Sequence, residues 1–334
     1  MKVCLLGRPG SGRETIFQAL TGLTAGPSRQ ALRQGEALVV DARLDWLSDL
    51  FQPKKRTPAR LELALPKPSG DQPLKGALEK ARDADALMMV LANFPGHDGP
   101  EPAQAAAELE SELLLTDYLT VSKRLERLDE DKKRGKKGDP EEAALLTTAL
   151  ADLEASRPLR LRPETAKAPQ LRGFGLLSAK PLLAVINNPD ETAQAPQLPL
   201  QVPQLTIRGR LEEEFSRLEP AEAAELMADY DLAELVGARA ARTLFELTDL
   251  LTFFTVGEDE CRSWPVPRGA TAWEAAGQIH SDIQKGFIRA EVVSFDDFKA
   301  CGGFNEAKKK GVFRLEGKTY VVADGDIVHF RFNV

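Results

Sequence analysis

Short apolar runs separated by amphipathic stretches occupy the first part of the chain. Runs of this kind predict buried strands at residues 2–6, 36–40, 60–65, 86–91 and 180–186. Between these runs, apolar residues spaced by three or four predict helices that begin near residues 16, 41 and 74. Strands that alternate with helices are typical of an α/β domain, with a Rossmann-like, mostly parallel sheet covered by helices on both faces.

A helical hairpin is predicted to interrupt this domain. From about residue 101 the apolar residues are spaced alternately by four and three, as in the seam of a coiled-coil helix. The seam consists of Leu114, Tyr118, Val121, Leu125 and Leu128. After a charged turn at residues 129–138, Asp139 as N-cap and Pro140 at the first helical position predict a second helix. We therefore expect an inserted coiled-coil hairpin at residues 105–169, between residues 1–104 and 170–250 of the α/β domain.

The last part of the chain is predicted to be a smaller module of mixed α+β structure. A helical pattern runs from residue 211 to about residue 247, and strand patterns follow it. The predicted strands lie at residues 253–256, 263–266, 288–293, 320–322 and 327–332. A helix is predicted at residues 271–284. We expect residues 251–334 to form a domain with its own core.

Composition narrows the function classes. The net charge of −7 over 334 residues argues against a protein that coats nucleic acid, so contacts with RNA would have to come from local basic patches. The three widely spaced cysteines indicate neither a disulfide framework nor a zinc knuckle. No basic and apolar signal pattern opens the sequence, and no apolar run reaches membrane-spanning length. We expect a cytoplasmic protein with no membrane partner.

The loop after the first predicted strand resembles a phosphate-binding loop. Strand, glycine-rich turn and helix bind a phosphate because loop amides and the helix N-terminus converge on one anion. The P-loop pattern is Gly, four residues, Gly, Lys, then Ser or Thr. Gly7 and Gly12 have this spacing, but Arg13 and Glu14 replace the last two residues. The candidate phosphate-binding residues are Gly7, Pro9, Gly10, Ser11, Gly12, Arg13, Glu14 and Thr15.

The two replacements change the chemistry of the loop. Arg13 keeps a positive charge, but its planar guanidinium is bulkier than the lysine ammonium. Glu14 places a carboxylate where phosphate oxygens crowd, and without a metal it would repel a nucleotide. As a hard oxygen donor it could instead bind Mg²⁺ directly. The sequence leaves both roles of Glu14 open.

Three stretches together resemble the YchF type of Obg-related P-loop NTPases, also called Obg-like ATPases. Residues 253–334 are similar to the family's TGS domain, a ubiquitin-like β-grasp module, and residues 324–334 match its ending closely. Residues 45–55 and 109–181 are similar to the family's helical insertion and its flanks, and the N-terminal loop is the third stretch. The resemblance implies a P-loop domain, an inserted hairpin and a TGS domain, with ATP or GTP as the nucleotide and ribosomes as partners.

The sequence departs from the family where the family hydrolyses nucleotides. The family has Lys and Ser at positions 13 and 14. Its switch I threonine is missing from residues 29–34, and its switch II Asp-x-x-Gly is replaced by Leu-Pro-Lys-Pro at residues 65–68. The family's base-recognition motif Asn-x-x-Glu, the variant linked to adenine over guanine, has a counterpart in Asn187-Asn188-Pro189-Asp190. Residues 208–210 take the place of the family's base-supporting Ser-Ala-Lys loop. The candidate base-binding residues are Asn187, Asn188, Asp190 and Gly209.

Two basic surfaces are candidates for ribosomal RNA. The tip of the predicted hairpin carries Lys132, Lys133, Arg134, Lys136 and Lys137. The predicted TGS domain carries Lys285, Arg289, Lys308, Lys309 and Lys310. Clusters of this kind contact the phosphate backbone or are simply solvated, and both interpretations stay open for each surface. Nothing in the sequence indicates DNA specificity, and it does not reveal the oligomeric state.

Three functions follow from these residues. Phosphoryl transfer depends on positioning and charge stabilisation, so the combined replacements predict a degenerate NTPase. Such a protein would bind nucleotide weakly or not at all, with Mg²⁺ doubtful, and would act as a ribosome-associated regulatory factor. A second hypothesis is a slow ATPase or GTPase in which Glu14 holds Mg²⁺ and Arg13 neutralises the phosphates. A third is an interaction scaffold without nucleotide.

Overall fold

The computed structural model describes residues 1–23, 32–67, 73–97, 99–136, 138–192 and 194–333. The chain divides into two compact units. The first unit comprises residues 1–37 and 61–244, and the second comprises residues 38–60 and 245–334. Lys137 and residues 29–31, the first half of the segment predicted to correspond to switch I, lie outside the described residues. Within the described ranges, no helix combines the length and apolarity needed to cross a membrane.

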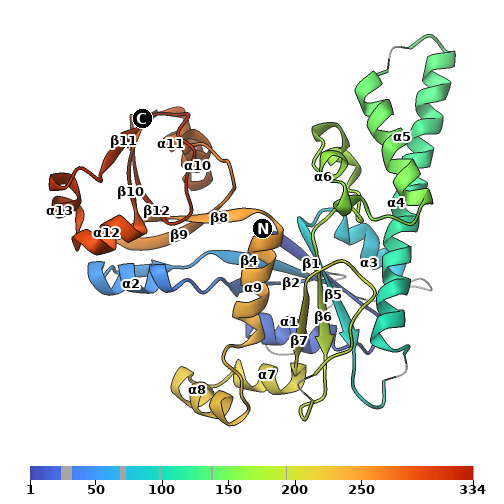
Figure 1. Cartoon of the computed structure of the whole chain (residues 1–334), viewed down its shortest axis with the longest axis horizontal. Coiled ribbons are helices and arrows are strands. Elements are labelled where there is room, and N and C mark those ends of the chain that lie inside the picture. The colour runs from blue at the N-terminus through green and yellow to red at the C-terminus, as the bar shows by residue number, and fades with distance from the viewer. Residues whose placement is uncertain (24–31, 68–72, 98, 137, 193, 334) are drawn as a thin grey trace. The chain divides into compact units, whose positions relative to one another are not determined.

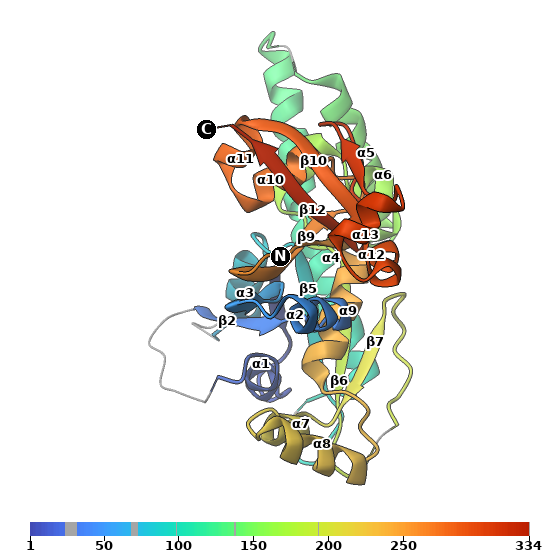
Figure 2. The same ribbon diagram turned by 90° about the vertical axis from the view of Figure 1, so that its left-hand side faces the viewer.

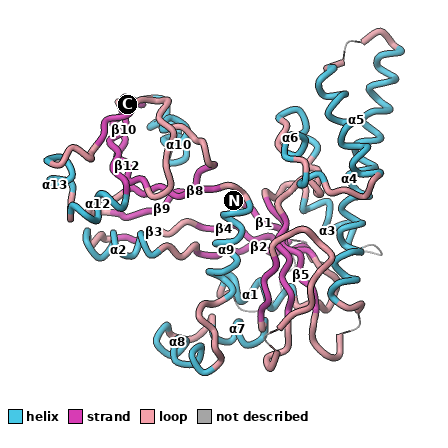
Figure 3. Tube along the Cα trace, viewed as in Figure 1, coloured by secondary structure: helices cyan, strands magenta, loops and turns pink. Residues whose placement is uncertain are grey.

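A six-stranded sheet forms the centre of the first unit (Figures 1 and 3). Its order is β2 (Leu32–Leu38), β4 (Arg60–Pro66), β1 (Lys2–Leu6), β5 (Ala86–Ala92), β6 (Leu182–Asn187) and β7 (Gln204–Ile207). The pairings from β4 through β1, β5 and β6 to β7 are all parallel. Every residue of β5 and β6 is buried, as expected for central strands covered on both faces. The predicted α/β fold is confirmed.

Besides the hairpin, the described part of the first unit contains five further helices of about two turns or more, some of which cover the sheet. They are α1 (Arg13–Thr21), α3 (Pro73–Ala81), α7 (Gly209–Phe215), α8 (Pro220–Asp229) and α9 (Val236–Leu247). One core cluster joins Leu78 of α3 and Leu109 of α4 (Pro102–Lys133) to Leu6, Met89 and Ile186 of the strands. One face of the sheet is thus covered by α3 and by the first turns of α4.

The hairpin consists of α4 (Pro102–Lys133) and α5 (Pro140–Glu154), which lie side by side in Figures 1 and 2. All the predicted seam residues pack in one cluster with residues of α5, among them Leu146 and Leu153. Asp139 accepts a hydrogen bond from the Glu141 amide at 2.9 Å, so the predicted N-cap is confirmed. The predicted charged turn is shorter than expected, because α4 continues to Lys133. Three short helices follow: η1 (Leu159–Leu161), α6 (Pro163–Ala166) and η2 (Pro169–Phe174).

The second unit has its own six-stranded sheet, seen in Figures 2 and 3. Its order is β11 (Arg314–Glu316), β10 (Phe287–Ser294), β12 (Asp326–Phe332), β8 (Leu250–Thr255), β9 (Glu260–Pro267) and β3 (Lys55–Thr57). Its helices are α2 (Ala42–Phe51), α10 (Ala272–Ile279), α11 (Ser281–Lys285), α12 (Phe295–Cys301) and α13 (Phe304–Lys309). Phe253 and Phe330 lie in one core cluster, and Phe254 and Phe298 in another, so this module is mixed α+β with its own core.

Several local predictions need correction. The helix predicted at residues 271–284 is broken at His280, which is extended and whose Nδ1 accepts a hydrogen bond from the Asp282 amide at 3.2 Å. The strand predicted at residues 320–322 is absent, and Val321 forms only an isolated bridge with Thr271. The strand predicted at residues 36–40 runs from Leu32 to Leu38 instead.

The structural division of the chain also differs from the expected domains. Residues 38–60 were expected in the P-loop domain, but the structure groups them with the second unit. There β3 pairs with β9 in parallel, and Leu44 and Leu47 are fully buried beside Phe254 and Phe298. This segment thereby supplies an edge strand and a helix to the C-terminal module.

Candidate functional site

The glycine-rich loop between β1 and α1, the candidate phosphate-binding loop, has a backbone that only glycine adopts easily. Gly10 and Gly12 have φ angles of 81° and 87°, in the left-handed region, and Gly12 is the N-cap of α1. A Cβ on Gly7 would lie 2.5 Å from the Val90 carbonyl oxygen and 2.8 Å from Ser11 Oγ. The buried Ser11 hydroxyl has no hydrogen-bond partner within the described ranges. The loop therefore depends on its glycines and leaves polar groups available.

Asn187 at the end of β6 joins this loop to the first residue of α7. Its side chain is 5% exposed; Nδ2 donates to the Ser11 carbonyl at 3.3 Å and Oδ1 accepts from the Gly209 amide at 3.1 Å. A Cβ on Gly12 would lie 2.1 Å from Asn187 Nδ2, and one on Gly209 would lie 2.5 Å from Oδ1. The structure thus brings together Ser11, Gly12, Asn187 and Gly209, which the sequence placed in separate motifs.

Asn188 shapes its own loop. It is 3% exposed, and its Nδ2 donates to the Thr192 and Gln194 carbonyls at 2.9 and 2.6 Å. Its Oδ1 accepts from Asn93 Nδ2 at 2.8 Å, so its amide is occupied inside the protein. Asp190 is only partly buried at the turn that follows. Of these two candidates, Asp190 is the one whose side chain is available to a ligand.

Arg13 opens α1 and lies beside a large pocket. It makes no hydrogen bond or ion pair with any residue in the part of the chain that the structure describes. Burial lowers the pKa of its guanidinium, while the Glu14 carboxylate acts in the opposite direction. A half-buried cation without an ion-pair partner is stabilised when an anion binds beside it. Arg13 therefore keeps the charge expected of a phosphate-binding loop.

Glu14 has a partner that the sequence analysis missed. Its carboxylate forms an ion pair with Arg33 of β2. The Arg33 side chain is 10% exposed, and its guanidinium lies 4.9 Å from the centre of the Phe17 ring on α1. The available signal was an arginine in the segment where a switch threonine was expected. An arginine thus holds the carboxylate proposed as a metal ligand.

The residues at this loop do not fit a magnesium ion. Mg²⁺ requires near-octahedral oxygen coordination and is usually held by one or two carboxylates besides phosphates and water. The only acidic residue of the candidate loop is Glu14, and its carboxylate is bound to Arg33. Among the described residues, no group of three or more His, Cys, Asp or Glu side chains could hold a metal.

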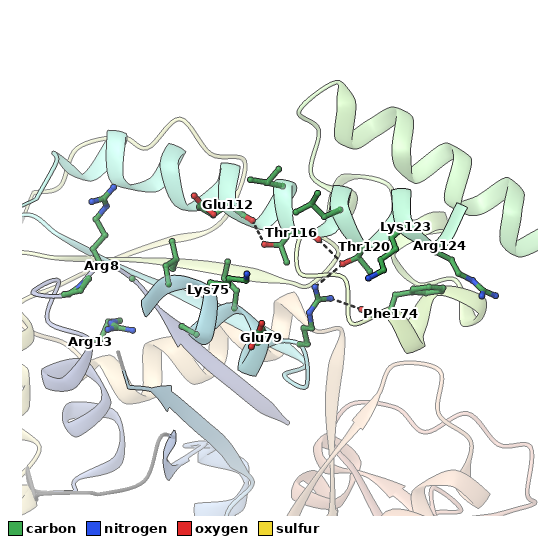
Figure 4. A pocket seen from close by; sticks show the side chains of 18 of the residues that line it. Arg8, Arg13, Lys75, Glu79, Glu112, Thr116, Thr120, Lys123, Arg124 and Phe174 are labelled. Carbon is green, nitrogen blue, oxygen red and sulfur yellow. Dashed lines mark hydrogen bonds between the residues drawn. The ribbon is translucent and has the colours of Figure 1, made fainter. Parts of the chain in front are cut away.

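A pocket of about 1040 Å³ extends away from the loop between α3 and α4. Figure 4 shows Arg8 and Arg13 at one end of it and Lys123, Arg124 and Phe174 at the other. No sequence pattern predicted this pocket. The available signal was a pair of leucines, Leu115 and Leu119, that lie on α4 outside the predicted seam.

The predicted RNA-contact residues lie in both units. Lys132, Lys133, Arg134 and Lys136 surround the turn between α4 and α5. Three of them form ion pairs: Lys133 with Asp129, Arg134 with Glu130 and Lys136 with Asp131. In the second unit, the candidates are Lys285 on α11, Arg289 on β10 and Lys308, Lys309 and Lys310 at the end of α13. The tip is therefore less positive than its lysine content suggests.

Comparison with known proteins extends over the whole chain. The YchF-GTPase_C family model, described as a protein of unknown function (DUF933), matches residues 250–333. The "Ribosome-binding ATPase YchF" of Haemophilus ducreyi is 33% identical over 361 aligned residues, covering 100% of this chain and 99% of that protein. The protein of the same name from Bacillus subtilis is 31% identical, and the alignment covers 99% of this chain and 98% of that protein. The structure of the Schizosaccharomyces pombe YchF GTPase matches with a TM-score of 0.85 at 25% identity, and the match covers 99% of this chain and 97% of that one. The chain belongs to the YchF family of Obg-like ATPases.

Proposed function

We propose that this chain is a ribosome-associated, nucleotide-binding protein in which hydrolysis of ATP or GTP is very slow or lost. Two similar proteins bear the name ribosome-binding ATPase, which supports association with ribosomes and binding of a nucleotide. The ion pair between Glu14 and Arg33 carries the rest of the proposal. In this pair Arg33 binds the carboxylate of Glu14, the residue directly after Arg13, the proposed phosphate-binding cation.

Binding of a nucleotide rests on groups that remain available. The glycine loop supplies backbone amides, and Arg13 supplies a cation without an ion-pair partner among the described residues. We assign the base contact to Asp190, whose side chain is only partly buried, while Asn187 links the two loops through its hydrogen bonds to Ser11 and Gly209. The bulk of Arg13 and the carboxylate of Glu14 near the phosphates oppose binding. We therefore propose a dissociation constant well above that expected for an intact loop.

Loss of hydrolysis follows from the missing charge stabilisation. In phosphoryl transfer a lysine and a metal ion neutralise the charge that develops in the transition state. The Glu14 carboxylate is paired with Arg33, and residues 65–68 contain neither an aspartate nor a glycine. Removing one stabilising group typically slows turnover about 10²- to 10³-fold. We propose that Arg33 replaces part of the metal's charge and that binding does not require Mg²⁺.

Isothermal titration with ATP, GTP, ADP and GDP tests this proposal. We expect the affinity to change less than about threefold when Mg²⁺ is replaced by EDTA, because arginines supply the positive charge. In the double variant Arg13→Lys/Glu14→Ser, we expect tighter binding in Mg²⁺ and a loss of that gain in EDTA. The single variant Arg13→Gln should weaken binding under both conditions.

The other two hypotheses predict different results. Magnesium-dependent micromolar binding with multiple turnovers by the unchanged chain would support the slow ATPase or GTPase. The absence of binding to any of the nucleotides, in Mg²⁺ and in EDTA, would support the scaffold without nucleotide. Either result contradicts the proposed function.

Ribosome association through the hairpin tip is tested separately, by co-sedimentation. We expect the variant Lys132→Glu/Lys133→Glu/Lys136→Glu to lose most ribosome binding, because phosphate contacts depend on positive charge and weaken with salt. The matched control is Lys54→Glu/Arg172→Glu/Lys318→Glu, which makes the same change in net charge at exposed positions elsewhere. If the tip variant and the unchanged chain bind ribosomes equally, the hairpin tip is not the ribosome contact. The candidate residues of the second unit would then be tested in the same way.

A further inference from the structure

The pocket shown in Figure 4 is an elongated groove, here called the α3–α4 groove. It begins at Gly7 and Arg8, passes Leu74 and Lys75 of α3, and follows α4 from Glu112 to Arg127. That length of helix spans about 22 Å. The groove lies wholly within the first unit. Its length and its volume of about 1040 Å³ suit a segment of polypeptide better than a compact small molecule.

One face of α4 forms the apolar wall of the groove. Leu115 and Leu119, one helical turn apart, are 52% and 59% exposed and both line it. The neighbouring face of α4, with Leu114 and Val121, is buried against α5. The exposed leucines therefore contribute nothing to the hairpin core. Apolar residues spaced by four are the usual contacts of an amphipathic helix lying in a groove.

The groove is basic although the chain is acidic. Its lining includes seven Arg and Lys side chains and two Glu side chains, while the whole chain has a net charge of −7. Arg8 and Arg124 are paired with Glu108 and Glu142, respectively. Arg82 donates to the Phe174 carbonyl and to Thr120 Oγ1, both at 3.0 Å.

Apart from Arg13, which is proposed above to bind the phosphates, the remaining cations of the groove are available to a partner. Arg13, Lys75, Lys123 and Arg127 form no ion pair with any residue in the described ranges. Lys123 and Arg127 lie one turn apart on α4, following Leu119 by four and eight positions. The apolar wall thus continues directly into a pair of positive charges on the same helix face.

We propose that the α3–α4 groove binds an acidic amphipathic helical segment of a partner protein. Leucine-type side chains of the segment pack on Leu115 and Leu119, and its carboxylates pair with Lys123 and Arg127. RNA fits the groove less well, because bases bind by stacking on aromatic rings and the groove lining contains a single one, Phe174. The contacts proposed here lie on α4, at Leu115, Leu119, Lys123 and Arg127, and include none of the residues proposed to bind nucleotide, although Gly7 and Arg13 line the other end of the same groove.

Fluorescence anisotropy with a labelled peptide tests the proposal on the full-length chain. The probe is a helical peptide of about 15 residues, with leucines spaced by three and four and glutamates at the other positions. We expect saturable binding that the variant Leu119→Asp weakens at least tenfold. The matched control is Leu315→Asp, since Leu315 is 58% exposed and lies in the second unit. It should leave the affinity within twofold.

The charge contribution has its own pair of variants. Lys123→Glu/Arg127→Glu should weaken binding at least tenfold, whereas Arg172→Glu/Lys318→Glu, with the same change in net charge, should not. A peptide of the same composition with its leucines dispersed should bind at least tenfold more weakly. The proposal is overturned by absent binding, by equal losses in the control variants, or by equal binding of the dispersed peptide. Displacement of the peptide by a uridine oligonucleotide would assign the groove to RNA instead.

Discussion

Replacement of Asp117 by alanine is expected to lower the free energy of unfolding by about 3 kcal/mol. Asp117 lies on α4 and is completely buried. Its carboxylate accepts hydrogen bonds from the Leu177 amide at 2.8 Å, the Ser178 amide at 2.7 Å and the Ser178 hydroxyl at 2.6 Å. Alanine would leave these donors buried without an acceptor, which costs about 1–3 kcal/mol for each group that water cannot reach.

The same carboxylate fixes the hairpin to the segment that leads into β6. Burial raises the pKa of the Asp117 carboxyl, and the hydrogen bonds from Ser178 and Leu177 oppose that change. Burying the carboxylate itself costs free energy, so the expected loss is closer to about 3 kcal/mol than to the sum of three hydrogen bonds. Urea unfolding followed by circular dichroism measures it.

Two further variants separate the carboxylate from the general effect of mutating α4. Asp117→Asn keeps one acceptor oxygen and should lose less stability than Asp117→Ala. Glu126→Ala removes an exposed carboxylate from the same helix and should change stability by less than about 0.5 kcal/mol. A loss below 1 kcal/mol for Asp117→Ala would show that the anchor is not needed.

Much of the fold could be predicted because its core elements have strong local patterns. The apolar run of β5 and the capping residues Asp139 and Pro140 each indicate one structure with few alternatives. The assignment of residues 38–60 to the second unit could not be predicted in the same way. It depends on the pairing of β3 with β9, two strands about 200 positions apart in the sequence. The break at His280 was also missed, since apolar residues continue through it at helical spacing.

In the candidate site, too, local features could be predicted from the sequence and long-range contacts could not. The spacing of Gly7 and Gly12 is a local signal, and it predicted the loop correctly as a turn between a strand and a helix. The ion pair between Glu14 and Arg33 is not local, because it requires β2 to lie beside α1. The sequence shows that Leu115 and Leu119 lie outside the hairpin seam, but that they are exposed and line the α3–α4 groove is known only from the structure.

Replacement of Gly12 by alanine is expected to lower the free energy of unfolding by about 3 kcal/mol and to abolish nucleotide binding. The φ angle of 87° is itself strained by about 1–2 kcal/mol for a residue with a Cβ. The new Cβ would also lie 2.1 Å from Asn187 Nδ2, so the Asn187 side chain must move. Its hydrogen bonds to Ser11 and Gly209 would break, at about 1 kcal/mol each.

Gly10 provides a control in the same loop. Its φ angle is 81°, but a Cβ there would meet nothing within 4 Å. Gly10→Ala should therefore show the backbone strain alone, about 1 kcal/mol. The difference between the two variants measures the contact with Asn187.

A double-mutant cycle identifies the cause of that difference. In an Asn187→Ala background the clash is absent, so Gly12→Ala should lower stability only as much as Gly10→Ala does. Thermal and urea unfolding measure the four proteins, and isothermal titration measures their nucleotide affinity. If Gly12→Ala lowers the free energy of unfolding equally with and without the Asn187 side chain, the contact with Asn187 is not the cause of the extra loss. Asn187 would then have no part in holding the phosphate loop, and the link between the phosphate and base segments would have to be carried by other residues.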